Sequence, residues 1–498
     1  MENDCRRADL GSTTTQLSRV FQLSSIYPRR TSGPDRASFQ RTRRLGQRWL
    51  SQVFLYQSQR SAVTSMAKKA SAVLLPTEIL AEIFAICLPA PDNINEETMI
   101  EHPRRLRRLL PTEMPLVVAS VCRRWRDAAL STPHLWVFLD LRDFNLAKKN
   151  PNGVVSSWLL RSVPYPLSFA AAPSSRAVLK EVMSQCERWN TVELVVNKGN
   201  SFQEVRGRLP CLTKIHLTVL NPHPYNSFAD APRLTHVSLL AHDLISIILP
   251  WHQLTNLVCE GFTDVACVKT LQQCPALIEC HFIGRNKPRS MKEILSYSRV
   301  VHQCLNSFQL DGTSALDTLR LLESPSLRVL KFSIENFSQD PQILPSFLTR
   351  SRCHLETLCV RQIDSTDLFR CLQPLSSLVT LEITTSRRFI TDEFLRWFTH
   401  DSTVLPNLQK LVLDLDLTAW WNSPDWDHSL LQEMVLSRCL ASGISRDVRL
   451  QTFRLLYTPN RNGGSDRLVE LATELAPLLE PHMAEFTISC KSRQSRVL

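Results

Sequence analysis

A chain of 498 residues with 43% apolar and 21% charged residues can bury two or three domain cores, which excludes a wholly disordered protein. The net charge of +11 is concentrated in residues 1–65, where eleven Arg and four acids leave 11 − 4 = +7, so the other 433 residues carry only +4. A nearly neutral body without a nucleic-acid-binding motif argues against nucleic acid as a partner.

The cysteines and the apolar windows indicate the compartment. The fifteen cysteines contain no CxxC pair and follow no signal peptide, so a reducing compartment, cytoplasmic or nuclear, is expected. The most apolar window, residues 238–251, contains His242 and Asp243 and is shorter than the roughly 20 residues that cross a bilayer. No membrane-spanning segment is predicted.

Residues 1–65 have no sustained apolar period and are expected to form a basic, disordered leader. An Arg- and Ser-rich leader is also compatible with a mitochondrial transit peptide, although the acids Glu2, Asp4 and Asp9 disfavour this reading. Translation could equally start at Met66.

The stretch LLPTEILAEIFAICLP predicts the first helix. Pro76 suits the first helical position, and Glu78 places a carboxylate near the positive end of the helix dipole. Apolar residues then recur at steps of three and four, and Pro89 ends the helix; the apolar positions are Ile79, Leu80, Ile83, Phe84 and Cys87.

A second helix is expected to begin after Pro115 and to end before Pro133, with an apolar face of Val118, Val121, Cys122, Trp125 and Ala129. The intervening residues 91–113 form a polar linker with a basic run, Arg104, Arg105, Arg107 and Arg108, which is either a solvated face or a surface for an acidic partner. Two short helices make a core too small to stand alone, so some apolar surface must meet a partner or the next domain.

Together, LLPTEILAEIFAICLPA and PLVVASVCRRWRDAALSTPHLWVFLDL resemble the F-box of the F-box-like proteins of mushroom-forming fungi, over residues 73–141. The inserted linker 91–113 departs from the family pattern. The resemblance implies a Skp-type adaptor and, through it, a cullin as partners, and it implies adaptor contacts by Leu75, Pro76, Ile79, Leu80, Ile83, Phe84, Val121, Cys122 and Trp125. Burial within the chain is the alternative for these side chains and is favoured for Trp125 and Cys122.

Residues 142–498 contain nine copies of an L-x-x-L-x-L pattern. The copies begin 20 to 30 residues apart, five of them have Pro two residues before the first Leu, and weaker copies at Trp189, Leu450 and Met483 extend the array. The first residues are Leu212, Leu234, Leu254, Leu277, Leu305, Leu327, Leu355, Leu378 and Leu408.

Helix signals between several copies, such as Asp264 and the candidate cap Thr391, predict a strand and a helix in each unit. This arrangement resembles a leucine-rich-repeat solenoid, although the usual Asn or Cys eight residues after the first Leu is missing in all nine copies. The predicted fold class is therefore α+β, a small helical F-box module followed by an irregular α/β solenoid.

Catalytic motifs are absent from the sequence, so neither an enzyme nor a cofactor site is predicted. Cys274, Cys280 and His281 are the nearest approach to a metal site, but structural zinc usually needs two close ligand pairs. Packing within one repeat is the favoured interpretation of these three residues.

A candidate target site lies in the longest step of the array, between Leu408 and Leu450. Trp420, Trp421 and Trp426 stand there among aspartates and could anchor a basic segment of a protein target, or they could cap the core of the array. The predicted function is substrate recognition for a Skp-cullin-F-box ubiquitin ligase. The alternatives are a repeat scaffold outside any ligase and a basic-tailed nucleic-acid or organelle protein.

Overall fold

The computed structural model describes residues 75–86, 114–142, 151–172, 176–197, 202–221, 224–241, 247–284, 297–312, 318–333, 342–361, 372–373, 375–385, 391–400, 404–416, 427–440, 449–458, 466–479 and 481–490. The chain divides into two compact units, Met1–Asp140 with Ala147–Leu167, and Leu141–Leu146 with Ser168–Leu498. The predicted leader, residues 1–65, and the predicted linker, residues 91–113 with its basic run, lie outside the described residues.

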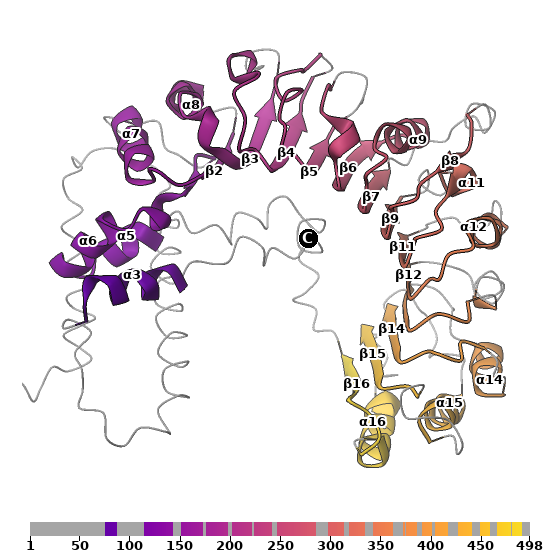
Figure 1. The fold of residues 1–498 in the computed structure, drawn as a ribbon. Helices are drawn as coiled ribbons and strands as arrows, with labels where there is room; N and C mark the ends of the chain where they lie inside the picture. The colour runs from indigo at the N-terminus through magenta and orange to yellow at the C-terminus, as the bar shows by residue number, and fades with distance from the viewer. Residues whose placement is uncertain are drawn as a thin grey trace, which may run out of the picture. The chain divides into compact units, whose positions relative to one another are not determined.

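The first unit is mostly helical (Figure 1). Its described elements are α3 (Thr77–Ile86), α5 (Met114–Ala119), α6 (Arg123–Leu130), the 3-10 turn η3 (Pro133–Trp136), the short strand β1 (Phe138–Asp140) and α7 (Pro151–Arg161). The first helix begins at the predicted place, since the Leu80 amide donates to the Pro76 carbonyl at 3.1 Å.

The prediction of one helix after Pro115 is wrong, because the structure has two short helices there, α5 and α6. Cys122 is extended, with φ −156° and ψ 173°, and its Sγ accepts the Trp125 amide at 3.5 Å, so that Cys122 is the N-cap of α6. The break places Val121 on the connection between the helices, where it is 48% exposed.

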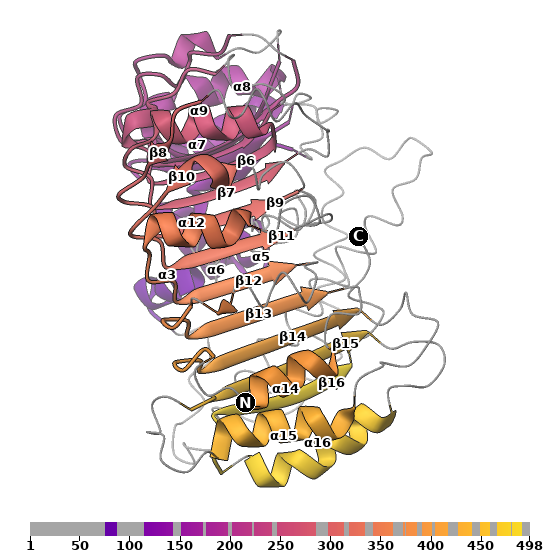
Figure 2. The ribbon, with the colours of Figure 1, turned by 90° about the vertical axis from the view of Figure 1, so that its right-hand side faces the viewer.

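The second unit is built around one large sheet whose strands follow one another in sequence order (Figure 2). Every pairing from β3 to β16 is parallel. The strands are β2 (Leu167–Ala171), β3 (Trp189–Val196), β4 (Lys214–Val219), β5 (His236–Leu240), β6 (Asn256–Phe262), β7 (Glu279–Gly284), β9 (Ser307–Asp311), β11 (Val329–Ser333), β12 (Thr357–Arg361), β13 (Thr380–Thr385), β14 (Lys410–Asp416), β15 (Thr452–Thr458) and β16 (Glu485–Cys490).

The register of the sheet aligns the copies of the sequence pattern. Ile215 lies opposite Val237, and Leu217 lies opposite Leu239, so equivalent apolar positions form continuous rows. The first leucine of every predicted copy is at most 4% exposed. One row contains Val192, Ile215, Val237, Leu257, Cys280, Phe308, Leu330, Leu358, Leu381, Leu411, Phe453 and Phe486.

The segments that connect one strand to the next, here called returns, differ along the second unit. In the second half they contain helices, which lie on one side of the sheet (Figures 1 and 2): α9 (Asp264–Gln273), α11 (Thr318–Leu321), α12 (Ile343–Ser351), α14 (Asp392–His400), α15 (His428–Leu440) and α16 (Asp466–Leu479). A second, two-stranded sheet pairs β8 (Val300–Val301) with β10 (Leu322–Glu323). Thr391 caps α14 as predicted, its Oγ1 accepting the Phe394 amide at 3.2 Å.

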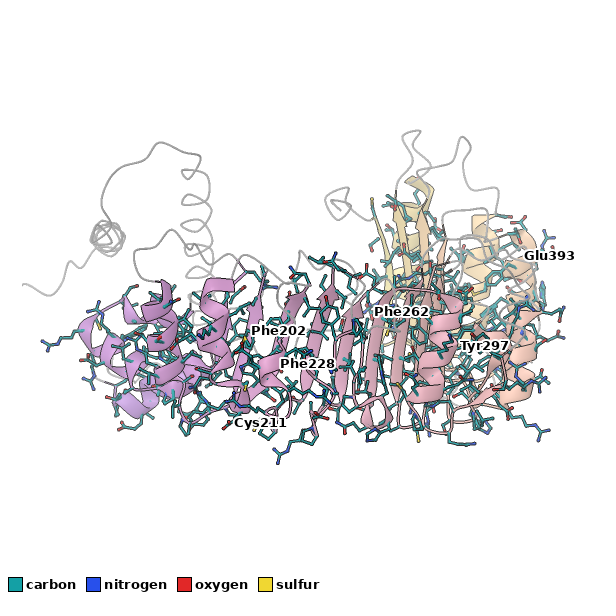
Figure 3. The ribbon with its side chains drawn as sticks, turned by 90° about the horizontal axis from the view of Figure 1, so that it is seen from above. Phe202, Cys211, Phe228, Phe262, Tyr297 and Glu393 are labelled. Carbon is teal, nitrogen blue, oxygen red and sulfur yellow. The ribbon has the colours of Figure 1, made fainter. Side chains whose placement is uncertain are left out.

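The prediction of one helix in every repeat of the sequence pattern is wrong for the first half of the sheet. One helix, α8 (Arg176–Met183), precedes β3. From β3 to β6 the described returns contain turns, the 3-10 segments η6 (Gln203–Val205) and η7 (Trp251–Gln253), and an isolated parallel bridge between Tyr225 and Ile247, but no α-helix. Buried aromatic side chains fill this part instead, among them Phe202 and Phe228 at 4% and 2% exposure (Figure 3). None of the described helices has the length and apolar character needed to cross a membrane.

Gly312 occupies a position that other residues fit poorly. Its φ is +95°, and a Cβ added there would lie 2.7 Å from the Gly284 carbonyl oxygen. We expect Gly312→Ala to lower the free energy of unfolding by about 1–3 kcal/mol in urea denaturation. Gly207→Ala is the matched control, because Gly207 has φ +73° but no atom within 4 Å of an added Cβ, and should cost less. Equal losses in both variants would show that the contact with Gly284 has no effect.

Candidate functional site

Helix α3 has one face in the core of the first unit and one face in solvent. Leu80 and Phe84 are 1% exposed, whereas Ile79 and Ile83 are 47% and 39% exposed. Ile86 is 80% exposed and, seven residues after Ile79, lies on the same side of the helix. The helix therefore presents a row of large aliphatic side chains to water.

The buried face of α3 packs against α6 and η3. The rings of Phe84 and Trp125 meet edge to face, with centroids 5.1 Å apart. Trp136 of η3 is 1% exposed, and its Nε1 donates to the Ala129 carbonyl at 2.8 Å. This small core fixes the helices, so the exposed side chains of α3 stand on a rigid support.

Helices α5 and α6 expose further apolar side chains. Leu116, Val117, Val121 and Leu130 are 54%, 42%, 48% and 38% exposed. Such a density of exposed large apolar residues on three short helices is characteristic of a protein-binding surface. We call the seven residues of these helices and their connection the exposed apolar set: Ile79, Ile83, Ile86, Leu116, Val117, Val121 and Leu130.

A cross-link between α6 and the start of α3 orients this set. The Arg124 guanidinium donates from Nη2 to the Leu75 carbonyl at 2.5 Å, across 49 residues of sequence. The carbonyl belongs to the residue just before Pro76, so the bond holds the first turn of α3 beside α6. Arg124 was absent from the sequence-based site, because a partner 49 residues away leaves no periodic signal.

The nine residues implied as adaptor contacts divide by exposure. Pro76, Ile79, Ile83 and Val121 are exposed. Leu75, Cys122 and Trp125 are half-buried, and Cys122 has its sulfur engaged in capping α6. Leu80 and Phe84 are buried in the core of this unit, so neither side chain can contact another protein while the unit keeps this conformation.

The sequence-based site missed Ile86, Leu116, Val117 and Leu130. Ile86 extends the row of Ile79 and Ile83 by one turn, a signal available from the helical period. The helical period does not place Leu116, Val117 and Leu130 on the apolar face of the predicted second helix. The prediction of one continuous helix, where the structure has α5 and α6, therefore left them out.

The second candidate site concerns the sheet. Trp420, Trp421 and Trp426, the predicted target anchor, lie outside the described residues, so their role stays a prediction. Polar residues alternate with the buried apolar residues along the strands, so they lie on the sheet face opposite the core, and several of them pair with one another. Arg142 Nη1 donates to both carboxylate oxygens of Glu193, to Oε1 at 3.0 Å and to Oε2 at 2.9 Å.

Glu382 is the centre of a larger group on this face. Its Oε1 accepts Lys410 Nζ at 2.7 Å, and its Oε2 accepts Cys359 Sγ at 3.4 Å. Burial by itself would raise the pKa of Glu382, but the hydrogen bond and charge of Lys410 outweigh it and lower the pKa. Arg454 and Glu485 form a neighbouring bidentate pair at 2.7 Å. The face therefore has a charge pattern suited to polar partners.

The residues closest to a metal-site pattern serve other purposes in the structure. Cys274 and Cys280 are buried, and burial raises the pKa of Cys274 to about 12, far from the thiolate that binds metals. His281 Nε2 lies 2.7 Å from Asp311 Oδ2, and the Cys274 carbonyl accepts from His302 at 2.7 Å if that nitrogen is protonated. Within the described ranges no group of three His, Cys, Asp or Glu side chains could hold a metal ion.

One segment of the chain is similar to a known protein family. No curated protein matches the chain. Residues 72–142, which contain α3, α5, α6, η3 and β1, match the family model described as F-box-like.

Proposed function

We propose that the chain is a substrate-recognition subunit of a Skp-cullin-F-box ubiquitin ligase. The observation that supports this most strongly is the solvent-exposed row of Ile79, Ile83 and Ile86 on the helix that opens the F-box-like segment. F-box domains commonly bind Skp-type adaptors, and an exposed apolar row on a rigid core suits that task.

The binding energy would come mainly from burying these aliphatic side chains. Each fully buried Ile or Leu contributes roughly 1.5–3 kcal/mol of transfer free energy, so a few of them can hold a stable complex. The half-buried Trp125 packs against Phe84 on the buried side of α3 and so stabilises the helix that carries the row. It does not need to contact the adaptor itself.

We further propose that the second unit is an irregular leucine-rich-repeat solenoid that holds the target protein. Three features support this proposal: the sequence-ordered parallel strands, the aligned apolar rows, and the helices confined to one side of the sheet. The polar sheet face opposite the helices is then the surface available to a target.

In this function the chain performs no chemistry of its own. It contributes proximity, holding lysines of the target near the conjugating enzyme that the cullin recruits. The proposed location is the cytoplasm or the nucleus, where such ligases meet their targets.

The test replaces exposed side chains without disturbing the core. Ile79→Ala with Ile83→Ala should weaken capture of a purified Skp-type adaptor at least tenfold, while the melting temperature changes little, because both residues lie on the solvent face of α3, at 47% and 39% exposure. Isothermal titration calorimetry with the full-length chain gives the affinity.

Leu160→Ala is the matched control. Leu160 lies on α7, outside the F-box-like segment, and is 74% exposed, so its loss should leave adaptor binding intact. If the wild-type chain binds no adaptor, or the double variant binds it as tightly as the wild type, the ligase proposal fails and the scaffold function becomes the better one.

A further inference from the structure

The last strand of the large sheet, β16, has a neighbour on one side only among the described strands. The Glu485 amide donates at 3.1 Å to the carbonyl of Gln451, the residue just before β15. In a parallel ladder the residues that bond a given neighbour alternate, so Glu485, Thr487 and Ser489 bond β15. The backbone groups of Phe486 and Ile488 therefore point away from the sheet.

This edge is also the least buried part of the sheet. All residues of β16 are at least partly exposed, including Phe486 and Ile488, whereas their neighbours Phe453 and Leu455 on β15 are 0% exposed. Natural sheets usually blunt such an edge with Lys, Pro or a bulge. The sequence EFTISC contains neither Lys nor Pro.

The order of side chains in β16 makes the strand complementary to itself. A twofold axis through Thr487 would place Phe486 opposite Ile488 of a second copy, with both side chains on the core side of the sheet. The same axis puts Glu485 opposite Ser489 of the second copy. Because Glu485 is already paired with Arg454 at 2.7 Å, this arrangement brings no unpaired like charges together.

We propose that two copies of this chain associate through antiparallel pairing of β16 with β16, centred on Thr487. The outward amides and carbonyls of Phe486 and Ile488 would bond those of the second copy, and the two sheets would continue across the axis. Phe486, which stacks on Phe453 at 5.9 Å, would lose its remaining exposure to water. This inference is independent of the proposed adaptor function.

The first test removes one outward hydrogen-bond donor. Ile488→Pro deletes an amide that bonds nothing in β15, and an edge strand tolerates Pro at such a position. We expect the full-length wild type to be a concentration-dependent dimer in sedimentation velocity and Ile488→Pro to be monomeric with an unchanged circular dichroism spectrum. A wild type that is monomeric at every concentration overturns the proposal, as does a dimer that persists in Ile488→Pro.

The second test checks the register. In the proposed pair, the Cα atoms of Thr487 lie about 4.5 Å apart across the axis, inside the range of roughly 4.4–6.8 Å that a disulfide spans. With Cys304 and Cys490, both exposed, replaced by Ser, Thr487→Cys should form a covalent dimer on mild oxidation. Ser489→Cys, two residues from the axis on the same strand, should not. Equal cross-linking of both variants, or none of either, contradicts the register.

Discussion

Replacing Trp136 with Ala is expected to lower the free energy of unfolding of the first unit by about 3–5 kcal/mol. The side chain is 1% exposed, and its Nε1 donates to the Ala129 carbonyl at 2.8 Å. Its ring meets that of Trp158 edge to face at 4.7 Å, and the Arg161 guanidinium lies 4.7 Å from its centroid. The substitution removes this packing and leaves a cavity in a small core.

Hydrogen exchange of residues 114–142, followed by mass spectrometry, would measure this loss in the unit where it occurs. Leu130→Ala serves as control, because a side chain that is 38% exposed should cost less than about 1 kcal/mol. Trp136→Phe keeps an aromatic ring and should fall between the two. A cost below about 1 kcal/mol for Trp136→Ala would mean that the core of this unit is organised around other residues.

Replacing Arg438 with Met is expected to cost about 2–3 kcal/mol. Arg438 on α15 reaches back to the end of α14, where Nε and Nη2 donate to the Phe398 carbonyl at 2.9 and 2.7 Å. Nη1 donates to the Val404 carbonyl at 2.8 Å, and the guanidinium stacks 4.7 Å from the Phe398 ring. The cation thus satisfies one carbonyl in the last turn of α14, at the negative end of the helix, and one carbonyl just beyond it.

Urea unfolding of the full-length chain would report this cost, with Arg396→Met as the matched control. Arg396 is exposed on α14, so its replacement should change stability by less than about 0.5 kcal/mol. Arg350 on α12 makes the equivalent bonds to Leu319 and Leu322 at 2.6 and 2.8 Å, and Arg350→Met should behave like Arg438→Met. Equal stability of the Arg438 and Arg396 variants would exclude this role.

Local sequence determined much of the fold. Pro76 placed the start of the first helix, and steps of three and four placed Leu80 and Phe84 on its buried face. The L-x-x-L-x-L copies located the strands of the sheet, because an apolar residue at every second position of a strand has to face the core. Thr391 capped α14 for an equally local reason, its side chain bonding an amide three residues away.

Other features were decided by tertiary structure alone. The break at Cys122 between α5 and α6 exposes Val121, which a continuous helix would have placed on the apolar face. The described parts of the returns from β3 to β6 use turns in place of helices, although the 22-residue step from Leu212 to Leu234 is nearly as long as the 23-residue step from Leu254 to Leu277, which contains α9.

Side-chain contacts that hold two helices or turns together join residues far apart in sequence, both in the candidate site and in the sheet unit. Arg124 meets Leu75 across 49 residues, and Arg438 meets Phe398 across 40. A periodic pattern records which side of an element faces the core, since that depends on neighbours within one or two turns. Which side chain of another element a residue contacts depends on the length and course of the chain between the two elements, and only the folded structure decides this contact.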